Sequence, residues 1–281
     1  MSWLSKILPP KLESTHKANI PEGLWVKCSG CSETLYKDDL KANLEICPKC
    51  GYHHAMSARD RIAQFIGTDF IEIAQGVTPI DFLGFVDSKS YADRIKQSQE
   101  KTGEKDALVC GFGSFNEIPV CVAAFEYAFI GGSMGSVVGE KFVQAVRYAA
   151  ENNTPFICVA SSGGARMQEG LTSLMQMTKT VASLTLLKNK SLPFISILAN
   201  PTMGGVSASF AFIGDVVIAE PNALIGFAGP RVIEQTLREK LPDGFQSAEF
   251  LLKNGAIDLV VSRKELPTQV YNILSILTKK Q

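Results

Sequence analysis

Histidine is scarce in this chain of 281 residues and occurs only near its N-terminal end. The three histidines are His16, His53 and His54. Residues 55–281 therefore have no imidazole that could act as a general base or as a member of a Ser-His-Asp triad. A nucleoside-triphosphate loop is missing as well, because no glycine-rich segment ends in Gly-Lys followed by serine or threonine. These two absences argue against a serine hydrolase and against a P-loop enzyme.

The chain also lacks an excess of charge and a long apolar run. It has 28 basic and 28 acidic side chains, so its overall charge gives no argument for binding nucleic acid or an anionic membrane. The most apolar stretch, residues 206–219, is interrupted by Asp215 and is shorter than the roughly 20 residues that span a bilayer. Residues 1–11 show no features of a secretory signal. We therefore expect a cytoplasmic protein without a membrane partner.

Seven cysteines fall into two groups. Three lie in apolar stretches of strand character, where a free thiol usually acts as a small buried hydrophobic side chain: Cys110, Cys121 and Cys158. The others form two Cys-x2-Cys pairs: Cys28, Cys31, Cys47 and Cys50. This spacing predicts a zinc ribbon whose four thiolates hold one structural Zn²⁺ per chain. Two disulfides are the alternative, but they need an oxidising compartment, of which the N-terminal residues give no sign.

Zinc ribbons often bind nucleic acid, so that function is a rival to any enzymatic one. Between residues 24 and 52, four lysines are matched by four acidic residues, and aromatic side chains are few. The segment therefore shows neither a basic stripe nor a platform for stacking bases. Nucleic-acid binding stays possible but unsupported.

The sequence divides into four segments. We expect an N-terminal extension over residues 1–23, the zinc ribbon over 24–56, a helical connector over 57–106 and a main domain over 107–281. In the main domain, pairs of strand-like runs alternate with helical patterns, which predicts an α/β fold of repeated β-β-α units. One expected helix, ending near residue 187, is apolar on most sides, so it should be buried in a core or at a subunit contact.

Glycine pairs follow two of the expected strands in the main domain. Gly163-Gly164 follows residues 156–160, and Gly204-Gly205 follows residues 194–199. A strand that ends in such a turn at a helix start directs unpaired N–H groups at one point, where they can stabilise an oxygen that becomes negative. Alternatively, the glycines only permit tight turns. A third pair, Gly131-Gly132, either packs a turn or contacts a ligand.

No protein base stands out beside these turns. The available carboxylates are, taken singly, more typical of helix caps, ion pairs or solvated side chains: Glu126, Glu140, Glu169, Asp215 and Asp258. Backbone donors without a protein base fit a reaction in which a carbonyl oxygen becomes an enolate and the proton goes to the substrate or a cofactor.

Taken together, the motifs resemble a known family. The four-cysteine ribbon is followed by four characteristic segments: Phe-Ile-Gly-Gly-Ser-Met-Gly-Ser (129–136), Ser-Ser-Gly-Gly-Ala-Arg-Met-Gln-Glu-Gly (161–170), Pro-Thr-Met-Gly-Gly-Val-Ser-Ala-Ser (201–209) and Phe-Ala-Gly-Pro-Arg-Val-Ile (227–233). From about Trp3 to the C-terminal end, this order resembles the β subunit of bacterial acetyl-CoA carboxylase carboxyltransferase.

The resemblance implies a crotonase-type superhelix of ββα units preceded by the small zinc ribbon. It also implies transfer of a carboxyl group from carboxybiotin, presented by a biotin carboxyl carrier protein, to acetyl-CoA. The product, malonyl-CoA, is formed in the first committed step of fatty acid synthesis. An α subunit completes the active site in an α2β2 assembly, and biotin carboxylase belongs to the larger complex.

The resemblance also assigns residues. Gly204 and Gly205 would donate N–H groups to the thioester enolate as catalytic residues. Substrate binding would fall to the turn formed by Gly163, Gly164, Ala165 and Arg166, together with Gly131 and Gly132. Two other functions stay open: a different crotonase-like acyl-CoA enzyme, such as a hydratase or hydrolase, and a zinc-ribbon protein that binds nucleic acid.

Overall fold

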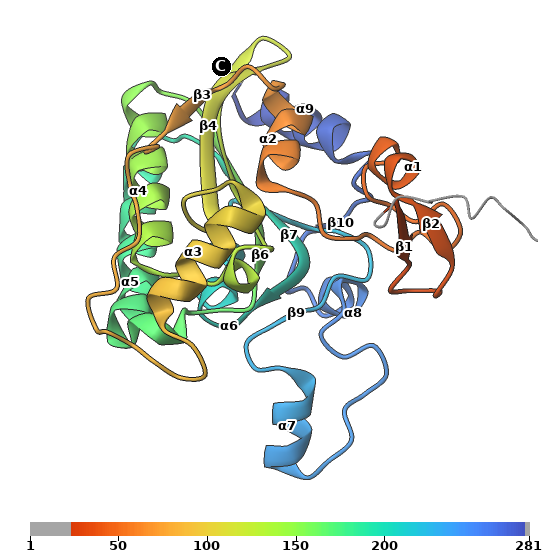
Figure 1. The fold of residues 1–281 in the computed structure, drawn as a ribbon. Helices are drawn as coiled ribbons and strands as arrows, with labels where there is room; N and C mark the ends of the chain where they lie inside the picture. Colours follow the sequence, from red (N-terminus) through yellow and green to blue (C-terminus); the bar gives the residue numbers. More distant parts are fainter. Residues whose placement is uncertain (1–23, 279–281) are drawn as a thin grey trace, which may run out of the picture.

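A twisted sheet of eight strands crosses the molecule, and helices lie on both sides of it (Figure 1). The computed structural model describes residues 24–278, so the expected N-terminal extension over residues 1–23 lies outside the described residues. The order across the sheet is β10-β8-β7-β6-β5-β4-β3, and β9 pairs in addition with β7. The strands are β3 (Ile71–Ile73), β4 (Leu108–Phe115), β5 (Ile118–Phe125), β6 (Phe156–Ser162), β7 (Phe194–Met203), β8 (Val216–Ala219), β9 (Ile225–Gly226) and β10 (Leu259–Val260).

Helices connect these strands. They are α2 (Ala58–Ile66), α3 (Tyr91–Thr102), α4 (Ser136–Glu151), α5 (Leu171–Lys188), α6 (Gly204–Ser207), α7 (Pro230–Leu237), α8 (Ala248–Lys253) and α9 (Leu266–Leu277), with short 3-10 turns η2 (Ile130–Gly132), η3 (Met167–Glu169) and η4 (Phe210–Phe212). Within residues 24–278, none of them combines the length and apolar character that crossing a membrane requires.

The direction of the central strands decides where the glycine turns lie. Strands β5, β6, β7 and β8 run parallel, whereas β3, β4 and β5 are joined antiparallel. Parallel neighbours have their carboxyl ends at the same edge of the sheet, which is where ligands bind in open α/β sheets. The turns that follow β6 and β7 therefore lie beside each other.

Each face of the sheet has its own hydrophobic core, because successive side chains of a strand point to opposite faces. On β6, Phe156 and Cys158 pack with Phe142 of α4, whereas Ile157 packs with residues of α2 and α9 such as Val270. The cysteines expected in the core, Cys110, Cys121 and Cys158, are all buried as free thiols.

Helix α5 packs on α4, but one side of it is not covered by the described part of this chain. Its buried residues are mostly polar, whereas several apolar side chains are exposed: Leu171, Leu174, Met175 and Val181. Leu171 is 71% exposed and Met175 is 51% exposed. Of the two predicted explanations for this apolar helix, burial in the core is therefore wrong. The alternative, a subunit contact, stays a prediction.

The N-terminal ribbon comprises β1 (Trp25–Lys27), β2 (Thr34–Tyr36) and α1 (Lys37–Ala42) (Figure 1). Hydrogen bonds from a buried arginine of the main domain, itself paired with a buried carboxylate, hold the ribbon in place. The carboxylate of Glu220 accepts hydrogen bonds from Arg263 at 2.7 and 2.8 Å and from Arg61 at 3.0 Å. Arg263 also donates to the main-chain oxygens of Leu44 and His54, at 2.8 and 3.0 Å. One buried arginine thus joins the core carboxylate to the ribbon backbone.

Replacing Glu220 with glutamine should lower the free energy of unfolding by about 3 kcal/mol, because two buried arginines lose their counter-charge. Burial by itself would raise the pKa of Glu220, but the charge of Arg61 and the hydrogen bonds from Arg263 outweigh it and hold this pKa well below its usual range. The stabilisation is therefore complete above the ordinary glutamate pKa of about 4.3 and is lost progressively as the pH falls below it.

Urea unfolding at pH 7 and at pH 3 tests this. Glu151 is exposed and its side chain has no partner within residues 24–278, so it offers the control Glu151→Gln, which should change stability by less than about 0.5 kcal/mol. The difference between the wild type and the Glu220→Gln variant should shrink at pH 3. A difference of the same size at both pH values contradicts the charge argument.

Candidate active site and zinc centre

The three glycine pairs meet at the carboxyl edge of the sheet. The N–H of Gly163 donates to the main-chain oxygen of Gly131 at 2.9 Å, which joins the η2 turn to the turn after β6. A Cβ built on Gly164 would lie 3.2 Å from the Cα of Gly204 and 3.5 Å from the nitrogen of Gly205. The structure thus brings together the glycines that the sequence analysis selected as one site.

Two of these glycines have no room for a side chain. A Cβ on Gly132 would lie 2.1 Å from the main-chain oxygen of Ser161, and one on Gly204 would lie 2.9 Å from the Cα of Gly164. Both glycines also have positive φ, near +60°, which L side chains rarely adopt. The glycines are therefore needed for the close approach of three backbone segments as well as for the turns.

Of the four N–H groups in the two original pairs, three already have acceptors. Gly163 donates to Gly131, Gly164 donates to the Ser162 hydroxyl at 3.0 Å, and Gly204 donates to the main-chain oxygen of Phe227 at 3.0 Å. The prediction that Gly204 offers its N–H to an enolate therefore needs correction. Its N–H continues the pairing of β7 with β9, an interaction between distant segments that the motif does not show.

Gly205 is different. It is buried at the start of α6, and within residues 24–278 its N–H has no hydrogen-bond acceptor. On the side where a Cβ would lie, Gly205 faces apolar atoms, because that Cβ would be 3.1 Å from the Met177 sulfur and 3.4 Å from the Met134 methyl group. A buried N–H without a partner is rare in proteins, and apolar surroundings strengthen any hydrogen bond it makes. Gly205 is thus the available donor of the pair.

Arg166 does not offer its side chain to a substrate. It is fully buried, and each of its five guanidinium N–H donors has a partner. Asp106 accepts two of these bonds, at 2.7 and 2.8 Å, while Ser133 and the Tyr91 hydroxyl accept the others. The Arg166 side chain therefore fixes the turn after β6, and the role of this turn in substrate binding stays a prediction.

Glu169 belongs to the same buried network. Its carboxylate accepts the Tyr91 hydroxyl at 2.7 Å and the N–H of Ser136, at the start of α4, at 2.5 Å. The other carboxylates considered from sequence are also engaged, by main-chain N–H groups or by a lysine: Glu126, Glu140, Asp215 and Asp258. All five thus have structural partners, as expected for caps and ion pairs.

Two residues of this network were not selected from the sequence. Tyr91 and Asp106 lie in the connector, 75 and 60 residues before Arg166. A tyrosine in a polar segment was the available signal, but its partner could not be read from the sequence.

Residues 131–135 also match the Gly-x-Ser-x-Gly pattern that is typical of serine hydrolases. The Ser133 hydroxyl, however, accepts a hydrogen bond from Arg166, and the histidines in the described part of the chain lie in the ribbon. These two observations argue against a serine nucleophile.

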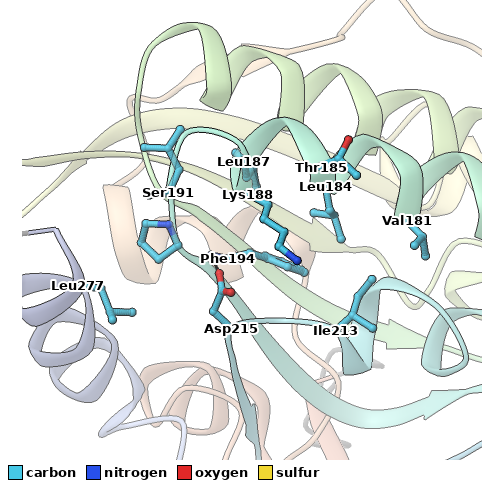
Figure 2. Close-up of a pocket in the computed structure, with 12 residues that line it drawn as sticks. Val181, Leu184, Thr185, Leu187, Lys188, Ser191, Phe194, Ile213, Asp215 and Leu277 are labelled. Atoms are coloured by element: carbon cyan, nitrogen blue, oxygen red, sulfur yellow. Dashed lines mark hydrogen bonds between the residues drawn. The ribbon is translucent and has the colours of Figure 1, made fainter.

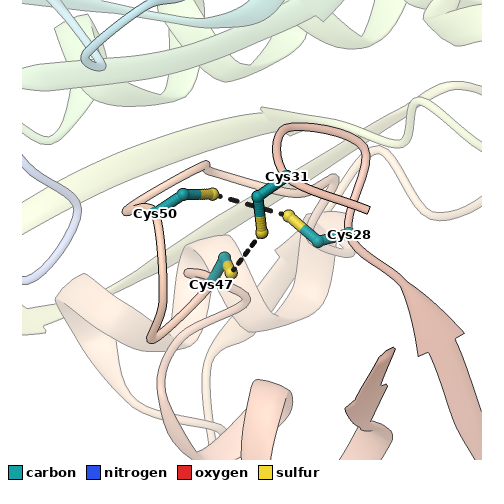
Figure 3. A group of neighbouring side chains, drawn as sticks. All are labelled: Cys28, Cys31, Cys47 and Cys50. Atoms are coloured by element: carbon teal, nitrogen blue, oxygen red, sulfur yellow. Dashed lines mark hydrogen bonds between the residues drawn. The ribbon is translucent and has the colours of Figure 1, made fainter. Parts of the chain in front are cut away.

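The four ribbon cysteines converge as predicted (Figure 3). Their sulfurs all lie within 4.8 Å of one another, with Cys28 and Cys50 3.6 Å apart and Cys31 and Cys47 3.9 Å apart. Zinc–sulfur bonds of about 2.3 Å place tetrahedral sulfurs about 3.8 Å apart, so the arrangement fits Zn²⁺. The four thiolates form a closed shell with no position for water or substrate, which indicates a structural site.

A cavity of about 670 Å³ lies elsewhere, between the second half of α5 and the start of β7 (Figure 2). Its lining includes Val181, Lys188, Phe194 and Ile213. Phe194 is the first residue of β7, whereas the donor turn follows the last residue of that strand. The cavity is therefore at the other end of the strand and does not belong to the glycine site.

Residues 77–281 match the carboxyl transferase domain, and the chain belongs to that family. Residues 25–50 match the acetyl-CoA carboxylase zinc finger domain. The combination supports the resemblance to an acetyl-CoA carboxylase carboxyltransferase β-type subunit.

Solved structures agree on the fold. A transcarboxylase 12S structure with methylmalonyl-coenzyme A and methylmalonic acid bound is 27% identical, with a TM-score of 0.65, over 78% of this chain and 41% of that chain. A Pseudomonas malonate decarboxylase hetero-tetramer in complex with malonate is 26% identical, with a TM-score of 0.62, over 79% of this chain and 82% of that one. The predicted crotonase-like α/β fold with an N-terminal zinc ribbon is thus confirmed.

Proposed function

We propose that this chain transfers the carboxyl group of carboxybiotin, presented by a biotin carboxyl carrier protein, to acetyl-CoA and so forms malonyl-CoA for fatty acid synthesis. The observation that carries the proposal is the N–H of buried Gly205, which has no acceptor in the described part of the chain and lies where the glycine turns meet. Carrier-bound biotin would supply the carboxyl group and accept the proton that the substrate methyl group loses.

The chain's own contribution follows from charge development. When acetyl-CoA loses a methyl proton, its thioester oxygen becomes negative, and the Gly205 N–H would donate to that oxygen. A preorganised donor in a water-excluded site stabilises such a transition state by about 3 kcal/mol. The turns of Gly163-Gly164 and Gly131-Gly132 would form the wall of the acyl-CoA pocket, held in shape by Arg166.

The proposed site is half of an active site. Residues with exposed apolar side chains adjoin both glycine turns: Met167 and Leu171 closely follow Gly163-Gly164 in the sequence, and the main-chain oxygen of Phe227 accepts the Gly204 N–H. Met167 is 63% exposed and Phe227 is 69% exposed. Helix α7, just beyond Phe227, has no buried residue. These surfaces fit an α subunit in an α2β2 assembly, within a larger complex with biotin carboxylase.

We expect the purified chain to be inactive alone and to gain malonyl-CoA-dependent carboxylation of biotin when mixed with its α partner. Strong activity of the lone chain would contradict a divided site. Acetyl-CoA should be preferred over propionyl-CoA and longer acyl-CoA esters when kcat/KM is compared for the complex. Hydration of crotonyl-CoA, followed by product analysis, would instead identify a different acyl-CoA enzyme.

A further inference from the structure

One hydrogen bond joins the zinc ribbon to the strand that carries the donor turn. The side-chain amide of Asn200 donates to the hydroxyl of Tyr52 at 3.2 Å, across 148 positions of the sequence. Tyr52 lies two residues after the zinc ligand Cys50, and Asn200 lies four residues before Gly204. The contact therefore links the two sites already described.

Within the ribbon, the position of Tyr52 depends on both cysteine knuckles. Its main-chain oxygen accepts the N–H of Cys47 at 2.8 Å, and its side chain packs against a cluster that contains Cys28. Gly30 lies so close that a Cβ there would be 2.9 Å from the Cβ of Tyr52. Closing the knuckles around one ion thus fixes the tyrosine.

On the main-domain side, Asn200 contacts the segments that frame the donor turn. Its side-chain oxygen accepts the N–H of Leu224 at 3.1 Å, just before β9, and β9 pairs with the end of β7. Its main-chain oxygen accepts the hydroxyl of Ser161 at 3.4 Å, next to the first glycine pair. A substitution of Asn200 is therefore expected to affect the segments on both sides of the glycine site.

We propose that Tyr52 and Asn200 are positioning residues that couple the zinc ribbon to the geometry of the Gly205 donor. The zinc-held knuckles fix Tyr52, Tyr52 fixes the Asn200 side chain, and Asn200 fixes the approach of Leu224 and β9 to the end of β7. The predicted effect on catalysis rests on the proposed function, whereas the effect on backbone protection does not.

The ribbon has a second attachment, which makes a clean test possible. Arg263 binds the ribbon main chain at Leu44 and His54 independently of Tyr52. Tyr52→Phe removes the hydroxyl but keeps the ring that packs against Gly30. The variant should therefore keep its zinc and its docked ribbon while it loses the contact with Asn200.

In the complex with the α subunit, Tyr52→Phe should lower kcat about threefold to tenfold with KM unchanged, because one hydrogen bond that orients a transition-state donor is lost. The control is Tyr36→Phe, a ribbon tyrosine whose ring packs on Trp25 and whose hydroxyl lies beside Asp38 of the ribbon, with no hydrogen bond to the main domain within the described residues. That variant should match the wild type. Metal analysis should give one zinc per chain in both variants.

Amide hydrogen exchange supplies a readout that does not depend on activity. In the Tyr52→Phe chain, residues 203–207 should exchange faster than in the wild type, whereas Tyr36→Phe should leave them unchanged. Asn200→Ala should accelerate exchange further, and the Tyr52→Phe/Asn200→Ala double variant should match Asn200→Ala alone if Tyr52 acts through Asn200.

Equal exchange in the Tyr52→Phe and Tyr36→Phe variants would overturn the coupling, whatever the enzyme does. Additive effects of Tyr52→Phe and Asn200→Ala would overturn the route through Asn200. If exchange changes as expected but no carboxyl transfer is found in the wild-type complex, the coupling stands and the proposed function fails.

Discussion

Gly204→Ala is expected to lower kcat of the complete enzyme by about 10² to 10³, the effect of losing one oxyanion donor. A Cβ at this position would lie 2.9 Å from the Cα of Gly164. This neighbour is a backbone atom, so it cannot move aside as the end of a flexible side chain can. The two glycine turns must then separate, which displaces the neighbouring N–H of Gly205 from the thioester oxygen. KM should change much less than kcat, because the donor acts mainly in the transition state.

Gly255→Ala is the matched control. Gly255 also has a positive φ, of 71°, but a Cβ there would have no neighbour within 4 Å. Both variants carry the strain of alanine in a left-handed conformation, about 1 kcal/mol, and only Gly204→Ala adds the backbone clash. Thermal unfolding of both should show that the Gly204→Ala chain is still folded at the assay temperature. A folded Gly204→Ala variant with wild-type kcat would refute the role of this turn.

Cys28→Ser is expected to reduce bound zinc from one ion per chain to nearly none and to unfold the ribbon. Besides two of the cysteines, the buried cluster of the described ribbon contains Leu35 and Leu40, with Val26 and Tyr52 packed against it, so the ribbon has little core of its own. Structural zinc contributes on the order of 10 kcal/mol to the folding of such modules, more than this cluster can replace. Metal analysis, together with hydrogen exchange over residues 25–52, measures both effects.

Cys110→Ala serves as the control for this experiment. Cys110 is a buried free thiol in β4, far from the ribbon in the sequence, and burial raises its pKa to about 12, so it does not act as a thiolate ligand at neutral pH. Its replacement should lower stability without changing the zinc content. Unchanged zinc in the Cys28→Ser variant would refute the four-cysteine site.

Local patterns explain why the zinc centre and the glycine turns could be predicted. The two ligands of a knuckle lie three residues apart, so their distance is set by one turn of chain, as for Cys28 and Cys31. A strand followed by a Gly-Gly turn and a helix start is likewise defined within about ten residues. Each feature is formed by interactions between residues that are close in the sequence, and the motif contains all of these residues.

Partners that lie far apart in the sequence could not be assigned in this way. Arg166 was assigned to the substrate-binding turn, but the motif that contains it does not show that Asp106 and Tyr91 surround its guanidinium. The N–H of Gly204 was expected to be free, because nothing in residues 201–209 reveals the pairing with Phe227. Which polar groups are already satisfied is decided by long-range contacts.

The sequence by itself determined the ribbon, the α/β class, the glycine site and the resemblance to a carboxyltransferase subunit. The tertiary structure decided that Gly205, and not Gly204, has the available N–H, that Arg166 fixes a turn, and that α5 leaves its apolar side chains exposed. It also placed Tyr52 against Asn200. The physical reason is that a motif specifies which donors and acceptors exist, whereas only the packing of distant segments specifies which of them remain unpaired.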